Sequence, residues 1–286
     1  MISCYLCHSE AIESVPGKVR DRPEISILRC TSCGLVFLDS FAHVHDSFYD
    51  ADYTEENHSK LDWQAFLNGC LQDDMRRYQQ LRPELANHRY LDVGCGAGGV
   101  LLMAREISKE VIGVEPQSRW RDLLADAGIN TASSLKDVAD AGYEVISLFH
   151  VLEHIPDPIP FLKEVLSKCA PGGRIFIEVP NADDALLTLY RNQAFMEFTY
   201  WSPHLFLYNP HTLARLLEKA GIPRERVAIS QFQRFPLSNH LLWLAEGRPG
   251  GHTTWSFLNS PELNEAYGAS LARIGRCDTL CAWIET

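Results

Sequence analysis

A glycine-rich turn after a short apolar segment, at residues 90–99, constrains the fold of this chain more than any other feature. The segment reads Tyr-Leu-Asp-Val-Gly-Cys-Gly-Ala-Gly-Gly and leads into a helical stretch. Gly94, Gly96 and Gly98 can adopt backbone angles closed to other residues, and without a Cβ they let a ligand approach the main chain. The helix that follows presents free N–H groups at its N-terminus. The pattern predicts a strand, turn and helix that bind the polar end of a nucleotide-like ligand.

Two carboxylates near this turn decide which ligand fits. Gly94, Gly96 and Gly99 also satisfy the Gly-x-Gly-x-x-Gly spacing of dinucleotide-binding folds, which alone is a weak signal. Asp92, however, stands two residues before the first glycine, where it would repel a pyrophosphate and suits a ligand with an ammonium and a sulfonium group. A second apolar strand, 110–115, ends at Glu115, at the distance where an acid holds both hydroxyls of a ribose. These charges favour S-adenosylmethionine over a nicotinamide dinucleotide.

Two further motifs follow in order along the chain. A third apolar strand, 143–149, is followed by His-Val-Leu-Glu-His-Ile-Pro-Asp-Pro at 150–158. Further on, Pro-Gly-Gly at 171–173 comes directly before another buried strand. Together with the glycine turn and Glu115, these motifs resemble the class I S-adenosylmethionine-dependent methyltransferases over roughly residues 86–232. The resemblance implies an α/β fold with a Rossmann-like, doubly wound, seven-stranded sheet.

The same resemblance implies which residues hold the cofactor. Its methionine part is expected at Asp92 and the glycine backbone, its ribose at Glu115, and its sulfonium side at the end of the third strand. The implied cofactor-binding set is Asp92, Gly94, Cys95, Gly96, Gly98, Glu115, Pro116, His150 and Val151. Many relatives also place an acid or amide on the adenine amino group, where this chain has Ala-Ser-Ser-Leu at 132–135. The adenine contacts therefore stay open.

Composition and charge restrict the class of substrate. A chain of 286 residues with 46% apolar content can bury one sizeable core and carry a small appendage. No apolar run approaches ~20 residues and the first residues lack a signal-peptide layout, so we expect a cytoplasmic protein without membrane insertion. The net charge of −11 argues against a nucleic-acid substrate, because affinity for nucleic acid comes largely from Lys and Arg. A small molecule is the expected partner, and the oligomeric state stays open.

The N-terminal segment contains two Cys-x-x-Cys pairs, Cys4 with Cys7 and Cys30 with Cys33, separated by 22 residues. This spacing is typical of structural zinc sites with four thiolate ligands. We predict a zinc ribbon over residues 1–40, in which the metal contributes folding free energy. The alternatives are haem attachment at the first pair, which is followed by a histidine, disulfides, and unrelated core cysteines. A similar ribbon precedes the cofactor domain in several deoxysugar methyltransferases, and by that resemblance it would cover part of the active site.

Residues 41–85 are expected to form a linker and a helix that covers the cofactor cleft. Apolar residues recur at helical spacing from about 60 to 81, and Pro83 is expected to end the helix. The methyltransferase domain is expected to take residues 86–286.

Substrate choice is expected in two insertions of that domain. Residues 186–208 are rich in aromatic side chains, and residues 233–276 combine polar and aromatic side chains between strands predicted at 226–232 and 279–284. Between the insertions, Asn209 is predicted to cap a helix that has Pro210 in its first position and Gly221 after its end. The mixture of polar and aromatic residues suits binding of a sugar.

Three histidines are candidates for a general base: His204, His154 and His150. Methyl transfer is a displacement at a carbon that the sulfonium already activates, so a base is needed only when the acceptor is a hydroxyl or an ammonium. His204 lies near the end of the aromatic insertion, shortly before the capped helix, and is the first choice. His154 can instead be a residue that shapes the cofactor loop.

The sequence predicts methyl transfer to a small polar acceptor, such as a sugar nucleotide or a precursor of a surface glycan, polysaccharide or natural product. Three alternatives remain: an RNA methyltransferase with a zinc ribbon, a nicotinamide-dependent oxidoreductase, and a non-catalytic module that binds S-adenosylmethionine. The composition argues against the first, and the charges around the glycine turn argue against the second. The acceptor atom, whether oxygen, nitrogen or carbon, stays open.

Overall fold

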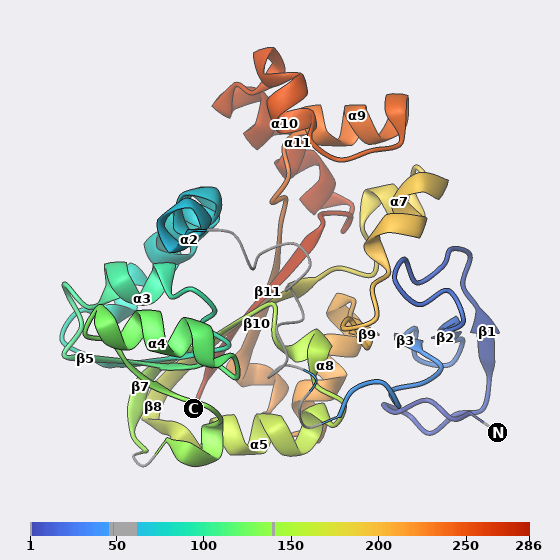
Figure 1. Ribbon diagram of the computed structural model, residues 1–286. Helices are drawn as coiled ribbons and strands as arrows, with labels where there is room; N and C mark the ends of the chain where they lie inside the picture. The colour runs from blue at the N-terminus through green and yellow to red at the C-terminus, as the bar shows by residue number, and fades with distance from the viewer. Residues whose placement is uncertain (1, 46–47, 49–61, 139–140) are drawn as a thin grey trace. The chain divides into compact units, whose positions relative to one another are not determined.

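The computed structural model of the chain describes residues 2–45, 48, 62–138 and 141–286 (Figure 1). The chain divides into two compact units. The first comprises Met1–Ala42, Leu152–Pro158 and Glu178–Ala282, and the second comprises His43–Val151, Ile159–Ile177 and Trp283–Thr286. Most of the expected linker, 46–47 and 49–61, lies outside the described residues.

The expected seven-stranded α/β sheet is confirmed. Its strands are hydrogen-bonded in the order β10-β11-β8-β7-β4-β5-β6. The strands are β4 (Arg89–Val93), β5 (Glu110–Val114), β6 (Asn130–Ala132), β7 (Tyr143–Phe149), β8 (Cys169–Pro180), β10 (Val227–Phe232) and β11 (Thr279–Glu285). β4 runs parallel to β5 on one side and to β7 on the other, so that Asp92 lies between Gly113 and Ser147. The chain order reverses between β4 and β7, and ligands of such sheets bind at the carboxyl ends beside this reversal.

One long helix precedes β4 in the second unit, and further helices follow its strands along the chain. They are α2 (Trp63–Leu85), α3 (Gly99–Ala104), α4 (Ser118–Asp126) and α5 (Pro158–Lys168), the last of which begins at the unit boundary. The prediction that Pro83 ends α2 is wrong, because the helix continues to Leu85. Leu81 and Leu85 are fully buried, and their packing stabilises a last turn that proline alone would weaken. The expected start of this helix, at residues 60 and 61, lies outside the described residues.

The N-terminal segment forms a small sheet of its own within the first unit, which we call the N-terminal sheet. Its strands are β1 (Ile12–Ser14), β2 (Ile27–Cys30), β3 (Val36–Leu38) and β9 (Phe206–Leu207), hydrogen-bonded in that order. β9 was not expected. It comes from the aromatic insertion and pairs antiparallel with β3. Tyr200, Phe206 and Tyr208 of this insertion are buried.

The capped helix was predicted correctly. α8 (Pro210–Lys219) begins after Asn209, whose side chain accepts from the N–H of Thr212 at 2.9 Å, while the Thr212 hydroxyl accepts from the N–H of Asn209 at 2.8 Å. Gly221 follows the helix with a φ of 93°, in the left-handed region that favours glycine. Two short helices precede it, α6 (Ala185–Thr188) and α7 (Gln193–Thr199). Within the described ranges, no helix has both the length and the apolar character required to cross a bilayer.

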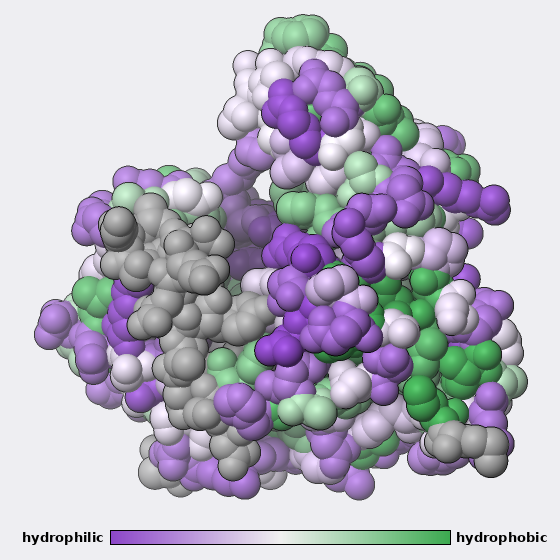
Figure 2. All heavy atoms as spheres, turned by 45° about the vertical axis from the view of Figure 1, so that its right-hand side comes forward, coloured by the Kyte–Doolittle hydropathy of each residue, from purple (hydrophilic) through white to green (hydrophobic). Residues whose placement is uncertain are grey.

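The insertion at 233–276 is helical, which the sequence pattern did not indicate. It contains α9 (Leu237–Glu246), α10 (Gly251–Thr254) and α11 (Pro261–Arg273). The buried ring of His240 connects two of these helices, since its Nδ1 lies 2.7 Å from the Tyr267 hydroxyl and burial lowers its pKa to about 4. Hydrophobic atoms reach the surface of this insertion at the top of the view in Figure 2, and the Phe257 side chain is 81% exposed.

Candidate functional site

A cavity lies in the second unit at the carboxyl ends of β4 and β7, as the strand order predicts. It is lined by the turn 94–100, by Asp92 and Phe149 at the two strand ends, and by one face of α2. The α2 residues on this face are Phe66, Cys70, Asp74 and Arg77, which recur at helical spacing. The cavity therefore brings the helix and the glycine turn together around two carboxylates, those of Asp92 and Asp74.

Three glycines of the turn have left-handed backbones, with φ values of 75° at Gly94, 51° at Gly96 and 79° at Gly98. A Cβ on Gly94 would overlap the side chain of Val151, and a Cβ on Gly98 would overlap Leu124. A Cβ on Gly96 would instead meet nothing within 4 Å. The turn thus packs tightly against its neighbours at its two ends and is open in the middle, where a ligand can approach the backbone.

Asp92 is only 3% exposed. Its Oδ1 accepts a hydrogen bond from the Ser147 hydroxyl at 2.6 Å, and that hydroxyl lies 2.6 Å from the hydroxyl of Tyr90. Burial raises the pKa of Asp92 to about 7, although the hydrogen bond from Ser147 and the positive charge of Arg77 act in the opposite direction. A cationic ligand in the cavity would stabilise the charged form of this buried carboxyl.

Asp74 and Arg77 are site residues that the sequence interpretation missed. Their side chains form an ion pair at 3.6 Å, and the Arg77 guanidinium lies 4.9 Å from the ring centre of Phe149. Asp74 is buried directly against Gly99, where a Cβ would overlap its carboxylate. The sequence could have indicated these residues, because a charged pair lies in the middle of an otherwise amphipathic helix and charged residues are rarely buried unless they are paired.

Glu115 follows β5 and is 7% exposed. Its Oε2 accepts from the N–H of Gly96 at 2.9 Å, and its Oε1 accepts from the N–H of Gln117 at 2.9 Å. Burial raises its pKa, and these two N–H groups partly offset that effect. Each carboxylate oxygen has a second lone pair, so the group is held in place and can still accept hydroxyl donors.

The remaining expected cofactor residues lie around the same turn. Cys95 lines the cavity, and its thiol packs against Gly113 of β5. The carbonyl of Pro116 accepts from the guanidinium of Arg121. His150, just after β7, has a φ of 55°, a strained conformation for a residue other than glycine.

His154 and His204 lie together in the first unit. Their ring centres are 4.9 Å apart in an edge-on arrangement, and the Trp201 ring centre is 5.7 Å from that of His204. Glu153 is fully buried beside them, and the three side chains offer ligand atoms within 4.8 Å of one another. His150, the third candidate base, belongs to the second unit.

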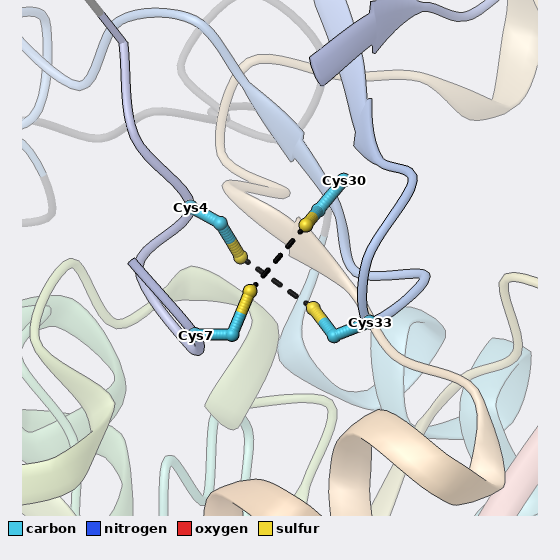
Figure 3. A group of neighbouring side chains, drawn as sticks. All are labelled: Cys4, Cys7, Cys30 and Cys33. Carbon is cyan, nitrogen blue, oxygen red and sulfur yellow. Dashed lines mark hydrogen bonds between the residues drawn. The ribbon is translucent and has the colours of Figure 1, made fainter. Parts of the chain in front are cut away.

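The four cysteines of the N-terminal segment point toward one another (Figure 3). The Sγ atoms of Cys4 and Cys33 are 3.5 Å apart, as are those of Cys7 and Cys30, and all four lie within 4.8 Å. Four thiolates around zinc, with bonds of about 2.3 Å, have sulfur atoms roughly 3.8 Å apart in a tetrahedron. We call this group the cysteine cluster, and its spacing fits a tetrahedral metal site.

The two Cys-x-x-Cys turns of the cluster have equivalent backbones. In the first, the N–H of His8 donates to the carbonyl of Cys4 at 2.8 Å, and in the second the N–H of Gly34 donates to the carbonyl of Cys30 at 2.8 Å. His8 and Gly34 are both left-handed, with φ values of 59° and 85°. This repetition orients both pairs of sulfur atoms toward one centre.

Comparison with known proteins agrees with this architecture. The family model described as "Methyltransferase domain" matches residues 63–222, more than half of the chain, and this range includes α2. A ubiquinone biosynthesis O-methyltransferase of Xanthomonas euvesicatoria is 26% identical over 162 residues, which cover 53% of this chain and 64% of that protein. The chain thus spans less than two thirds of the length of this relative.

Solved structures share the fold. A S-adenosylmethionine-dependent methyltransferase from Archaeoglobus fulgidus has a TM-score of 0.51 at 20% identity, and the match covers 82% of this chain and 98% of that one. A chain from the complex of a Haloferax volcanii methyltransferase with the activator Trm112 has a TM-score of 0.53 at 12% identity, covering 78% and 93%. The family match and the shared fold show that the chain belongs to the class I S-adenosylmethionine-dependent methyltransferase-domain family.

Proposed function

We propose that this protein transfers a methyl group from S-adenosylmethionine to a hydroxyl of a small polar acceptor. The observation that carries the proposal is the pair of buried carboxylates, Asp92 and Glu115, on the two sides of one left-handed glycine turn. This arrangement suits a ligand that presents an ammonium at one end and a ribose in its middle. The bound cofactor supplies a methyl group that its sulfonium already activates.

In this proposal each site residue has one task. Asp92 pairs with the ammonium of the methionine part. From α2, the charge of Arg77 lowers the pKa of Asp92 and the charge of Asp74 raises it. Glu115 accepts both ribose hydroxyls while the N–H groups of Gly96 and Gln117 hold it in place. The open middle of the turn leaves room for the ligand beside the backbone. These residues bind and orient, which provides much of the acceleration in a displacement reaction.

His204 is the proposed general base and takes the proton of the acceptor hydroxyl. Its edge-on contacts with His154 and Trp201 restrict the orientation of its ring. An oxygen acceptor is supported by the relatives named as ubiquinone biosynthesis O-methyltransferases. His154 and His150 remain the alternative candidates.

We propose a nucleotide-linked sugar, or another polar precursor of a glycan or natural product, as the acceptor class. The net charge of −11 disfavours polyanionic partners, and the insertion at 233–276 combines polar and aromatic residues. The resemblance to deoxysugar methyltransferases with an N-terminal ribbon supports the same class.

Two experiments test this function. Calorimetry should detect binding of S-adenosylhomocysteine and none of NADH. A methyl-labelled cofactor incubated with a panel of sugar nucleotides, phenols and RNA should label a sugar nucleotide. Binding of NADH, or label in RNA alone, would contradict the proposal, and binding without label in any acceptor would favour a non-catalytic module.

We also propose that the cysteine cluster binds one structural zinc ion. Burial raises the pKa of Cys4 to about 11 and also raises the pKa of Cys33. Burial acts in the same direction on Cys30, but the N–H groups of Cys33 and Ser32 and the thiol of Cys7 outweigh it and lower that pKa to about 7, so a bound cation is needed to hold the whole cluster as thiolates. Four cysteine ligands fill all four positions of a tetrahedral zinc ion, so no coordination position stays open for a substrate.

The zinc proposal predicts one equivalent of zinc per chain in protein purified without added metal. Because the metal provides folding free energy for a small sheet, Cys30→Ser should lose the zinc and destabilise the N-terminal sheet. Elemental analysis and proteolysis of the N-terminal segment measure both effects. Cys169→Ser, outside the cluster, is the matched control and should keep the metal. Bound haem, or a metal-free protein that stays folded, would contradict the assignment.

The pKa of Asp92 predicts a pH-dependent affinity for S-adenosylhomocysteine. In the free protein burial raises this pKa to about 7, whereas pairing with an ammonium requires the carboxylate. Affinity should therefore rise with pH by up to about tenfold per unit below pH ~7 and then level off. Calorimetry near pH 6 in two buffers of different ionisation enthalpy should detect release of close to one proton. Asp92→Asn should bind weakly at every pH, and an affinity independent of pH in the unmodified protein would contradict the role.

A further inference from the structure

The segment that carries His204 is built into the N-terminal sheet of the first unit. β9 pairs with β3, and the N–H of Leu38 donates to the carbonyl of Leu205 at 3.0 Å. The N–H of Leu205 donates in turn to the carbonyl of Glu153 at 2.8 Å. One segment thus connects the N-terminal sheet with the loop 152–158.

A residue inside the first Cys-x-x-Cys turn contacts the same loop. Tyr5 stands between Cys4 and Cys7, and its hydroxyl donates to the carboxylate of Asp157. Its ring centre lies 5.4 Å from that of Phe206 in β9. The turn that would hold the metal is therefore tied by a side chain to the loop that carries one candidate base.

Two consecutive residues of the N-terminal segment contact the residues that precede His204 in the chain. The Arg20 guanidinium lies 4.5 Å from the ring centre of Trp201 and 4.9 Å from that of Phe198. Asp21 accepts from the N–H of Ser202 at 3.0 Å and from its hydroxyl at 2.6 Å. These contacts fix the backbone and the aromatic side chains just before the histidine.

The aromatic ring held by Arg20 contacts the proposed base directly. Trp201 packs edge-on against His204, and the N–H of His204 donates to the Trp201 carbonyl at 2.9 Å. His204 then contacts His154. A continuous series of contacts runs from the N-terminal segment to both histidines.

We propose that Tyr5 and Arg20 are positioning residues for methyl transfer, Tyr5 acting through Asp157 on the loop of His154 and Arg20 acting through Trp201 on His204. The inference rests on the proposed role of His204. The N-terminal segment would then orient catalytic side chains in addition to its structural role.

The contacts of these two side chains are suited to orientation more than to stability. Arg20 is exposed, and cation–π contacts of exposed residues contribute little to the free energy of unfolding. The backbone pairing of β3 with β9 involves neither side chain. Loss of the side chain should therefore leave the sheet folded and release the ring of the histidine that it orients.

The first experiment compares turnover in Arg20→Gln and Tyr5→Phe. Each variant should lower kcat about three- to tenfold, with the KM for S-adenosylmethionine within about twofold of the unmodified protein and zinc content unchanged. Arg20→Lys keeps a cation over the rings and should restore most of the rate. Lys18→Gln is the matched control, because it removes an exposed ion pair of the same segment with Glu197 and should leave kcat unchanged. Unchanged kcat in both Arg20→Gln and Tyr5→Phe would overturn the proposal.

The second experiment tests whether Arg20 acts through His204. In a His204→Asn background, Arg20→Gln should cause no further loss, because its target is already absent. Equal loss in both backgrounds would overturn the positioning role and indicate a general effect on folding.

The third measurement does not depend on activity. In protein labelled at histidine, the ring resonance of His204, assigned through His204→Asn, should move in Arg20→Gln and stay in Lys18→Gln. An unmoved resonance overturns the inference even where methyl transfer is established. A moved resonance in a protein whose His204→Asn variant keeps full turnover overturns the base assignment and leaves the contact between Arg20 and His204 standing.

Discussion

His204→Asn is expected to lower turnover by roughly 10²- to 10⁴-fold, the usual contribution of a general base. Asparagine keeps a polar side chain of similar reach but cannot take the proton of a hydroxyl at neutral pH. Its amide can retain part of the packing against Trp201 and His154, so the fold should persist. Initial-rate measurements at saturating cofactor give the result, and the affinity for S-adenosylhomocysteine should hardly change.

Two further variants make this test specific. His211→Asn replaces an exposed histidine of α8 and should keep normal turnover. His154→Asn should lower the rate less than His204→Asn if it only shapes the loop. Near-normal turnover of His204→Asn together with an inactive His154→Asn would move the base to His154.

Glu115→Ala is expected to weaken binding of S-adenosylmethionine by roughly ten- to a thousandfold. The variant removes two charge-assisted hydrogen bonds to the ribose, each contributing about 1.5–3 kcal/mol before water compensates part of the loss. It also removes the acceptor for the N–H groups of Gly96 and Gln117, so some loss of stability is expected as well. Relief from burying a carboxylate offsets that loss in part.

Calorimetry measures the affinity, and thermal unfolding without ligand measures the stability. Glu110→Ala is the control, because Glu110 begins the same strand and pairs at the surface with Arg89 at 2.6 Å. It should leave the affinity unchanged. An unchanged dissociation constant in Glu115→Ala would mean that another group holds the ribose.

The parts of the fold that sequence patterns predicted are those with local signals. The parallel strands were found because buried strands read as short apolar runs, and β7 has the bounds expected for it. Asn209, Pro210 and Gly221 mark the two ends of α8 through capping chemistry that operates within a few residues. The cysteine cluster was predicted for the same reason, since its two turns have a diagnostic spacing.

The parts that were missed depend on contacts between distant segments. Asp74 and Arg77 act on Asp92, a partner on another element, and nothing in the helix pattern names that partner. β9 has only two residues and is a strand because β3 offers it a hydrogen-bonding edge. The helical character of 233–276 was missed because Gly and Pro interrupt its pattern.

The pairing of β9 with β3 has a consequence for synthesis of the chain. Phe206 follows Leu38 by 168 positions, so a ribosome that adds ~5–20 residues per second makes the closing strand roughly ten to thirty seconds after its neighbour. During that interval the outer edge of β3 exposes unpaired backbone groups, which in any sheet invite pairing with another chain. A longer interval should therefore favour aggregation of nascent chains through this edge, so slowed elongation should lower the yield of native protein, whereas fewer nascent chains at one time should increase it.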